Sequence, residues 1–193
     1  MKLIFATNNE NKVKEFKSLV GDHLEIITLQ DAGIDIDIPE PHDTLEANAR
    51  EKSEVIHRMT NTNCFSEDTG LEIDALDGAP GVLSARYAGE QKLAADNIAK
   101  VLQEMQGVTN RAAQFRTVIS LILDNKEYQF EGICSGTITT EVKGEKGFGY
   151  DPIFVPDGAT KAFAEMDMAE KNLYSHRAKA FHQFAAFLNT IQA

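Results

Sequence analysis

The stretch LIFATNNENKVKEFKSLV, residues 3–20, decides the class of fold. Its first residues are apolar and predict a short β-strand, and the polar TNNENK of residues 7–12 predicts a connecting loop. Beyond the loop, apolar side chains recur at the spacing of one helix face, at Val13, Phe16, Leu19 and Val20. A strand that passes through a short loop into an amphipathic helix is typical of α/β proteins, so we expect an α/β fold.

Length and composition indicate one globular domain. The chain has 193 residues, of which 42% are hydrophobic and 25% charged, which are ordinary values for a folded protein. We therefore expect a single domain over residues 1–193. The formal charge of −11 argues against a nucleic-acid partner bound through a broad basic surface. The apolar run at the N-terminus is too short for a signal peptide or a membrane span.

The cysteines and histidines bear on compartment and metal chemistry. Cys64 and Cys134 lie among apolar or small residues without a partner at metal-ligand spacing. Two reduced thiols are therefore the expected state, with a disulfide or a catalytic thiol as alternatives, and this predicts a cytoplasmic protein. None of the histidines is spaced as zinc ligands are. They are His23, His42, His57, His176 and His182.

Strand and helix patterns continue to alternate along the chain. Strand patterns occur at residues 25–29, 34–38, 71–75, about 113–123 and about 127–142. Residues 124–126 suggest a hairpin between the last two, which would make the sheet mixed. A helix is predicted over about residues 92–106, and a C-terminal helix carries Phe181, Phe184, Leu188 and Ile191 on one face.

Another helix is predicted to begin near Asp43, which pairs with Glu46 as a capping box. Its expected apolar face contains Leu45, Ala49, Val55, Ile56 and Met59. Lys52 lies close to that face, which is an unusual place for an ammonium group. Most such lysines extend their charge to solvent, but one that reaches into a cleft would meet a phosphate.

Two groups of cations are candidate anion sites. The loop at residues 7–12 ends at a helix start, where backbone N–H groups and the helix dipole favour an anion, and Lys12 adds a full charge. Such asparagine-rich turns are also common without a ligand. Ser175 is a good N-cap, which puts His176 and Arg177 in the first turn of the last helix. Positive side chains there oppose the dipole unless an anion compensates, and Lys171 lies nearby in sequence.

The glycine-rich GFGYDP of residues 147–152 is a candidate site for a planar base. An aromatic side chain beside a carboxylate in a tight loop can stack on a base and accept hydrogen bonds from its edge. Here these residues are Phe148 and Asp151. The alternative is a packed turn whose Phe148 belongs to the core.

The carboxylates offer a magnesium site, because Mg²⁺ prefers oxygen ligands and is typically held by one or two carboxylates plus substrate phosphates. Glu67 and Asp68 lie together in SEDTG, and Glu40 lies in the rigid Pro39-Glu40-Pro41. The DTG triplet also occurs in aspartic proteases, where two aspartates share one proton. This chain has one DTG, so a protease would have to be a homodimer.

Taken in order, these stretches resemble the inosine/xanthosine triphosphate pyrophosphatase family. The matching segments are FATNNENKVKE, SEDTGLEIDALDGAPGVLSARYAGE, GFGYDPIFVP, EKN and SHRAKA, which span nearly the whole chain. The resemblance implies an elongated mixed sheet flanked by helices, with two lobes and a central cleft, and usually a homodimer. The family typically has a glycine where this chain has Asn8 or Asn9, and asparagine tolerates positive φ nearly as well.

The resemblance also implies roles for individual residues. Asp68 is expected to be the general base and, with Glu40, to contact Mg²⁺, for which Mn²⁺ can substitute. The residues expected to bind the triphosphate and the purine are Thr7, Asn8, Asn9, Glu10, Asn11, Lys12, Lys52, Thr69, Phe148, Gly149, Tyr150, Asp151, Lys171, His176 and Arg177.

The implied reaction is hydrolysis of a deaminated purine nucleoside triphosphate (ITP, dITP or XTP) to the monophosphate and pyrophosphate. Water would attack the α-phosphorus, oriented by Asp68, with the metal and the lysines neutralising the phosphates. Backbone N–H groups near residues 147–149, or the pair His176 and Arg177, would recognise the 6-oxo group. A pyrophosphatase for dUTP, dTTP or modified pyrimidine nucleotides and a non-catalytic nucleotide-binding module are the alternatives.

Overall fold

The computed structural model describes residues 1–20 and 24–192, and the chain forms two compact units. Unit 1 comprises Met1–Asp68, Thr117–Gly132 and Arg177–Ala193. Unit 2 comprises Thr69–Arg116 and Ile133–His176. Both units are assembled from segments distant in sequence, and the single domain of residues 1–193 stays a prediction.

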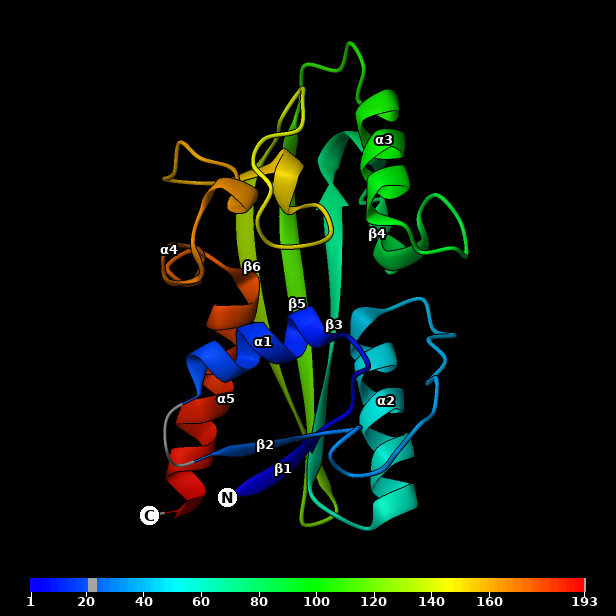
Figure 1. The fold of residues 1–193 in the computed structure, drawn as a ribbon, viewed down its shortest axis with the longest axis vertical. Coiled ribbons are helices and arrows are strands. Elements are labelled where there is room, and N and C mark those ends of the chain that lie inside the picture. The colour runs from blue at the N-terminus through cyan, green and yellow to red at the C-terminus, as the bar shows by residue number, and fades with distance from the viewer. Residues whose placement is uncertain (21–23, 193) are drawn as a thin grey trace. The chain divides into compact units, whose positions relative to one another are not determined.

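The strands form one mixed sheet among the described residues, with the order β2-β1-β3-β5-β6-β7 and with β4 beside β3 (Figure 1). In unit 1, β1 is parallel to both β2 and β3. In unit 2, β4 is antiparallel to β3, and β7 is antiparallel to β6. The predicted α/β class and mixed sheet are confirmed. The bounds are β1 Lys2–Phe5, β2 Glu25–Thr28, β3 Cys64–Ile73, β4 Pro80–Gly81, β5 Ala112–Leu123, β6 Lys126–Ile138 and β7 Phe154–Pro156.

In unit 1, helices cover both faces of the sheet (Figure 1). The helices are α1 (Glu10–Leu19), α2 (Leu45–Thr60) and α5 (His176–Gln192). Helices α1 and α5 share a core with one strand face, built from Leu3, Phe5, Phe16, Phe65, Ile119, Leu121, Phe181 and Phe184. Helix α2 covers the other face, with Ile4, Ala6, Leu29, Ile56, Cys64 and Ile122. The alternation of side chains along each strand supplies both cores.

Unit 2 has its own core, under helix α3 (Ala94–Glu104). Helix α3 contributes Ile98 and Val101, its C-cap residue Met105 adds a third side chain, and the strands contribute Leu71, Ile73, Phe115 and Ile138. The segment that follows β6 adds Tyr150, Ile153, Phe154, Phe163 and Met166. The short helix α4 (Met168–Asn172) follows this segment. Because Tyr150 of GFGYDP lies in the core, this loop is packed on the core of unit 2.

The predicted strand at residues 34–38 is wrong. The alternation is real, because Ile34, Ile36 and Ile38 are half-buried against the α2-side core and the intervening aspartates are exposed. The segment nevertheless has no strand assignment. The backbone C=O of Ile36 accepts a hydrogen bond from the Asn8 side chain, at 2.7 Å. The alternation of apolar and polar residues correctly predicted which side chains are buried, but it did not predict whether the backbone pairs with a strand.

Two further predictions need correction in the helices. The N-cap of α2 is Thr44 and not Asp43, since the Thr44 side chain accepts a hydrogen bond from the N–H of Ala47. Met59 and Ile191, placed on apolar faces by spacing, are 55% and 45% exposed. Both lie within the last two residues of their helix. The hairpin is confirmed, with Asp124 and Asn125 at positive φ between β5 and β6.

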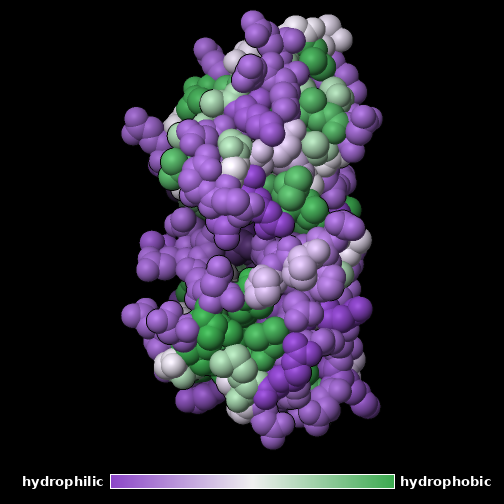
Figure 2. Space-filling model, turned by 90° about the vertical axis from the view of Figure 1, so that its right-hand side faces the viewer, coloured by the Kyte–Doolittle hydropathy of each residue, from purple (hydrophilic) through white to green (hydrophobic). Residues whose placement is uncertain are grey.

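The face of the molecule shown in Figure 2 is mostly hydrophilic. In Figure 2, hydrophobic residues gather in limited patches within a hydrophilic surface. In the described part of the chain, we find no helix with the length and apolar character needed to cross a membrane. Cys64 and Cys134 are buried thiols, as predicted.

Candidate functional site

Unit 1 contains a cluster of two carboxylates and one lysine, which we call the carboxylate–lysine cluster: Glu40, Lys52 and Asp68. The Lys52 Nζ lies 2.6 Å from Glu40 Oε1 and 3.0 Å from Asp68 Oδ1. Lys52 is only 6% exposed, so it does not extend its charge to solvent. The helix position that looked anomalous in the sequence is therefore the position that meets the candidate metal ligands.

Burial and mutual contact change the proton affinities in this cluster. Burial raises the pKa of Asp68 and nearby Glu40 adds to the rise, although Lys52 opposes it. Burial also disfavours ionised Glu40, but attraction to Lys52 outweighs this and lowers the pKa of Glu40. For Lys52, burial opposes the charge, yet Asp68 and Glu40 together raise its pKa. Asp68 is thus the better proton acceptor of the two carboxylates.

Strand β3 binds α2 through three side chains on one strand face. Cys64 Sγ donates to the C=O of Ser53 at 3.2 Å, and Ser66 Oγ donates to the C=O of Ala49. Asp68 follows on the same face and binds Lys52. These contacts fix the rotation of α2 over β3, and with it the approach of Lys52 to Asp68.

The segment before α2, residues 33–43, brings Glu40 to the cluster. Asn48, which is fully buried, accepts a hydrogen bond from the N–H of His42 at 2.9 Å and donates one to the C=O of His42 at 3.1 Å. At the other end, Asn8 holds Ile36. Two asparagine side chains therefore hold this segment on either side of Glu40.

The loop at residues 7–12 forms the start of α1. The Asn9 side chain caps the helix by accepting the N–H groups of Asn11 and Lys12, at 3.0 and 3.2 Å. Thr7 Oγ1 accepts the N–H of Asn9 at 3.2 Å. Asn9 has φ −84°, so it does not use the positive φ that asparagine tolerates. The cap engages two N–H groups that a phosphate would use, so a bound phosphate at those groups would replace the Asn9 side chain.

Lys12 leads into a second buried network, the arginine network: Lys12, Glu15, Glu67 and Arg177. Lys12 Nζ lies 2.9 Å from Glu67 Oε1, and Arg177 binds Glu67 at 3.1 Å and also binds Glu15. Arg177 is 2% exposed, and the two glutamates raise its pKa although burial opposes the charge. Arg177 thus joins α5, α1 and β3 within unit 1.

Unit 2 contains the aromatic–lysine cluster: Phe148, Asp151, Phe163 and Lys171. Lys171 Nζ lies 2.6 Å from Asp151 Oδ2, and 5.2 and 5.3 Å from the ring centroids of Phe148 and Phe163. Asp151 also accepts the N–H of Phe148 at 2.9 Å. Gly147 permits this, because a Cβ there would lie 2.0 Å from Asp151 Oδ2 and φ is +71°.

The other residues of unit 2 that were predicted to bind the substrate are Thr69, Gly149, Tyr150 and His176. His176 is 2% exposed and stacks on Phe115, with ring centroids 4.6 Å apart and an interplanar angle of 18°. Tyr150 is buried and donates to the C=O of Ser84 at 2.7 Å. Gly149 has φ +60°, and Thr69 is half-buried on β3. Lys171 and His176 belong to unit 2 and Arg177 to unit 1, so the three predicted cations are divided between the units.

The donor chemistry of the carboxylate–lysine cluster fits Mg²⁺. Glu40 and Asp68 present hard carboxylate oxygens, both near enough to bind one ammonium group. Within residues 1–20 and 24–192, no group of three or more His, Cys, Asp or Glu side chains could hold a metal by itself. His23 lies outside the described residues. Two carboxylates suit an ion that completes its shell with water and substrate phosphates.

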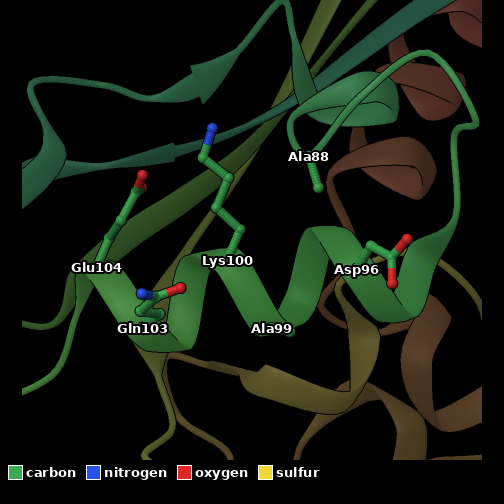
Figure 3. A pocket seen from close by; sticks show the side chains of 6 residues that line it. All are labelled: Ala88, Asp96, Ala99, Lys100, Gln103 and Glu104. Atoms are coloured by element: carbon green, nitrogen blue, oxygen red, sulfur yellow. The ribbon is translucent and has the colours of Figure 1, made fainter.

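A separate hollow of about 620 Å³ lies beside α3 in unit 2 (Figure 3). It is lined by Ala88, Asp96, Ala99, Lys100, Gln103 and Glu104. Lys100 donates to the C=O of Tyr87 at 2.9 Å, and the Tyr87 hydroxyl donates to Glu104. None of these lining residues was predicted to be functional, and two of them, Lys100 and Glu104, bind the adjoining Tyr87. We therefore regard the carboxylate–lysine cluster of unit 1 and the aromatic–lysine cluster of unit 2 as two separate candidate functional clusters.

Sequence reasoning missed several residues that build these clusters. Asn48 and Ser66 were not singled out, because one asparagine in a helix or one serine in a strand has many ordinary explanations, although both are buried. Glu15 gave no signal, because its partner Arg177 is 162 residues away. Glu67, one of the candidate magnesium carboxylates named from the sequence, binds Lys12 and Arg177.

The fold and clusters define a class: a mixed α/β protein with a metal-compatible carboxylate pair and a second lysine among aromatic rings. The model of the Ham1 family matches residues 3–187. The chain therefore belongs to the Ham1 family.

Relatives match over almost their whole length. A dITP/XTP pyrophosphatase of Porphyromonas gingivalis is 50% identical, over 97% of this chain and 97% of that protein. One of Flavobacterium johnsoniae is 48% identical, over 97% and 98%. Among solved structures, the Staphylococcus aureus Ham1 protein is 39% identical with a TM-score of 0.88, over 98% of this chain and 99% of that one. A HAM1 protein from Coxiella burnetii is 34% identical with a TM-score of 0.90, over 98% and 99%.

Proposed function

We propose that this chain hydrolyses deaminated purine nucleoside triphosphates, namely ITP, dITP and XTP, to the monophosphate and pyrophosphate. It is a nucleoside triphosphate pyrophosphatase, which removes these compounds from the nucleotide pool. Full-length relatives named dITP/XTP pyrophosphatase support the substrate class. The observation that carries the chemistry is Lys52 bound by both Glu40 and Asp68.

Asp68 is the proposed general base. A water oxygen attacks the α-phosphorus, the bond from that phosphorus to the leaving pyrophosphate breaks, and the water proton passes to the Asp68 carboxylate. The pKa of Asp68, raised by burial, supports this role because a carboxylate that binds protons more strongly accepts one more readily. Lys52 keeps the carboxylate oriented and adds positive charge for the phosphates.

Mg²⁺ is the proposed cofactor, with Mn²⁺ as a substitute, held by Glu40 and Asp68. When bound, it neutralises triphosphate charge and lowers the pKa of water. Residues 7–12 bind the triphosphate in this proposal: Thr7, Asn8, Asn9, Glu10, Asn11 and Lys12, with Thr69 beside Asp68 also touching the substrate. The start of α1 supports this, since Lys12 and the helix dipole both favour an anion.

The aromatic–lysine cluster receives the purine in this proposal. Phe148 stacks on the base, with Gly149, Tyr150, Asp151, Lys171, His176 and Arg177 around base and phosphate. Recognition of the 6-oxo group needs a hydrogen-bond donor, and the N–H of Phe148 already binds Asp151. We therefore expect the donor to come from Gly147, Gly149 or His176. A site built around such a donor rejects adenine, because its buried groups would lose their partner.

Assembly and location are further parts of the proposal. We expect a homodimer, as the resemblance implies, and sedimentation analysis of the purified chain would measure it. We expect a cytoplasmic protein, since buried thiols such as Cys64 persist in reducing compartments. The two lobes with a substrate cleft between them also remain a prediction.

Steady-state hydrolysis of ITP, XTP, ATP, GTP and dUTP with Mg²⁺, measured by pyrophosphate release, tests the function. We expect kcat/KM for ITP and XTP to exceed that for ATP and GTP by about 10²-fold or more. A preference for dUTP would assign the chain to pyrimidine nucleotides. Binding of ITP without release of pyrophosphate would make it a nucleotide-binding module.

A further inference from the structure

The segment that carries Glu40 is held by side chains and not by strand pairing. Residues 34–41 have no helix or strand assignment. Ile34, Ile36 and Ile38 pack against the α2-side core, which fixes which face of the segment points inward. Apolar packing alone leaves the segment able to slide along its own direction, because dispersion contacts are not directional. Polar contacts must therefore fix its register.

Asn48 supplies the most completely buried of these contacts. It is 0% exposed and binds both the N–H and the C=O of His42. The side-chain amide of Asn48 bonds to the backbone N–H and C=O of the same residue, as a neighbouring strand does in a β-sheet. These two bonds fix which residue of the segment lies opposite Asn48. Loss of the amide would remove both of these hydrogen bonds from the backbone of His42, and with them the contact that fixes its position along α2.

Rigid backbone connects this contact to Glu40. Pro39 and Pro41 flank Glu40, so two φ angles are fixed by pyrrolidine rings, and Glu40 itself is restricted to extended conformations by the proline that follows it. Between His42 and Glu40 few soft torsions remain. The orientation imposed at His42 is therefore transmitted to the Glu40 side chain.

The spacing of Asn48 and Lys52 on α2 matches the spacing of their partners His42 and Glu40 on the segment. Asn48 and Lys52 are four residues apart, which puts them on one helix face about 6 Å apart along the axis. Asn48 holds His42 and Lys52 holds Glu40, so the segment runs antiparallel to α2 and is attached at two points. The first contact is to the backbone and the second is to the candidate metal ligand.

We propose that Asn48 is a positioning residue for Glu40, and that by holding the backbone of His42 it places the Glu40 carboxylate for metal binding. The inference rests on the proposed role of Glu40 as a metal contact. Its direct prediction concerns the affinity of the protein for the metal alone. Residues that orient a metal ligand typically change metal affinity by about 10–100-fold when they are removed.

The test is the binding of Mn²⁺ alone, measured by the EPR signal of free Mn²⁺ during titration of the full chain without nucleotide. We expect Asn48→Ala to weaken Mn²⁺ binding about tenfold. Glu40→Gln measures how much Mn²⁺ affinity falls when the carboxylate ligand itself is lost. In the double variant, Asn48→Ala should add nothing to Glu40→Gln, because a residue that acts through Glu40 has no effect once that carboxylate is gone.

The matched control is Asn97 on α3 of unit 2. It is buried like Asn48 and also clamps a loop, accepting the N–H of Ala88 at 2.7 Å and donating to the C=O of Ala85 at 3.1 Å. Asn97→Ala should lower the melting temperature comparably and leave Mn²⁺ affinity within twofold of wild type. Equal weakening of Mn²⁺ binding by both variants would overturn the proposal, since general destabilisation would then explain it.

A second variant, Pro41→Gly, covers the case in which Asn48→Ala does not fold. Pro41 is exposed, and its replacement leaves the Asn48 contact but makes the connection to Glu40 flexible. We expect weaker Mn²⁺ binding at nearly unchanged stability. Wild-type Mn²⁺ affinity in Pro41→Gly, or additive effects in the double variant, contradicts the inference. Hydrolysis of ITP is measured separately, so an inactive protein with the expected Mn²⁺ pattern would reject the proposed function alone.

Discussion

Lys52 and Lys171 are two buried lysines of similar exposure, 6% and 4%, with different surroundings. Lys52 in unit 1 binds two carboxylates, Glu40 and Asp68. Lys171 in unit 2 binds the carboxylate of Asp151 and lies near two phenylalanine rings. With all groups ionised, the first cluster carries a formal charge of −1 and the second is neutral.

This difference separates two kinds of recognition. A cluster with surplus carboxylate attracts a cation and retains a group that accepts a proton. A neutral pair beside aromatic rings offers a flat apolar surface with a fixed polar edge, which suits a purine. In the proposed function, a buried lysine would thus serve phosphate and metal chemistry in unit 1, and another would serve base recognition in unit 2.

The largest expected effect comes from Asp68→Asn in the carboxylate–lysine cluster. The amide keeps the shape but cannot accept the water proton, so kcat for ITP should fall by about 10²–10⁴-fold. Pyrophosphate release under saturating ITP and Mg²⁺ measures this, with circular dichroism as the control for folding. Activity within a few-fold of wild type would remove Asp68 from the role of base.

Next in size is Lys171→Met in the aromatic–lysine cluster. It leaves Asp151 buried without its ammonium partner, and breaking such a pair costs about 3–5 kcal/mol of unfolding free energy. For a chain of this length that corresponds to a fall in melting temperature of roughly 6–15 °C. Calorimetry checks it. The double variant Lys171→Met/Asp151→Asn should recover part of the loss, and no recovery would mean that the pair is not the cause.

A smaller effect is expected from Phe148→Ala, which removes the proposed stacking surface. Stacking on an aromatic side chain contributes about 1–3 kcal/mol per base, so KM for ITP should rise about tenfold while kcat changes less. Phe148→Tyr keeps the ring and is the matched control. A fall in kcat at constant KM would place Phe148 in the chemistry and not in base binding.

The smallest effect is expected at the thiols, which report on the two units separately. Burial raises the pKa of Cys64 to about 12, so at pH 8 almost no thiolate is present and a thiol reagent should react slowly with native protein. Raising the pH toward 12 would be needed to ionise it in the folded state. Labelling of Cys64 and Cys134 along a urea titration, located by mass spectrometry, shows whether the units open together. Rapid labelling of native Cys64 would disprove its burial.

Much of the fold was predictable because its signals are local. The strand–loop–helix start, the β5–β6 hairpin and the long helices follow from periodicity and turn residues within short windows. The alternating segment at residues 34–38 misled for the same reason, since a period of two reports burial and not a hydrogen-bonded neighbour.

Most of the candidate site residues could also be identified from the sequence, but the residues that they bind could not. Lys52 stood out as a charge on an apolar helix face, and the structure pairs it with Glu40 and Asp68. Arg177 was expected near phosphate and base, and the structure buries it between Glu15 and Glu67. Asn48 was missed because an asparagine in a helix has many ordinary explanations.

By itself, then, the sequence determined the α/β class and the hairpin, and it named the polar residues from which the proposed nucleotide site is built. Only the tertiary structure decided which carboxylate meets which cation. The physical reason is that secondary structure depends on neighbours within a few residues, whereas the pairs Glu40–Lys52, Lys52–Asp68 and Glu15–Arg177 join different elements that come together on folding. Folding also buries Asp68, and this burial is the main cause that raises the pKa of its carboxyl group.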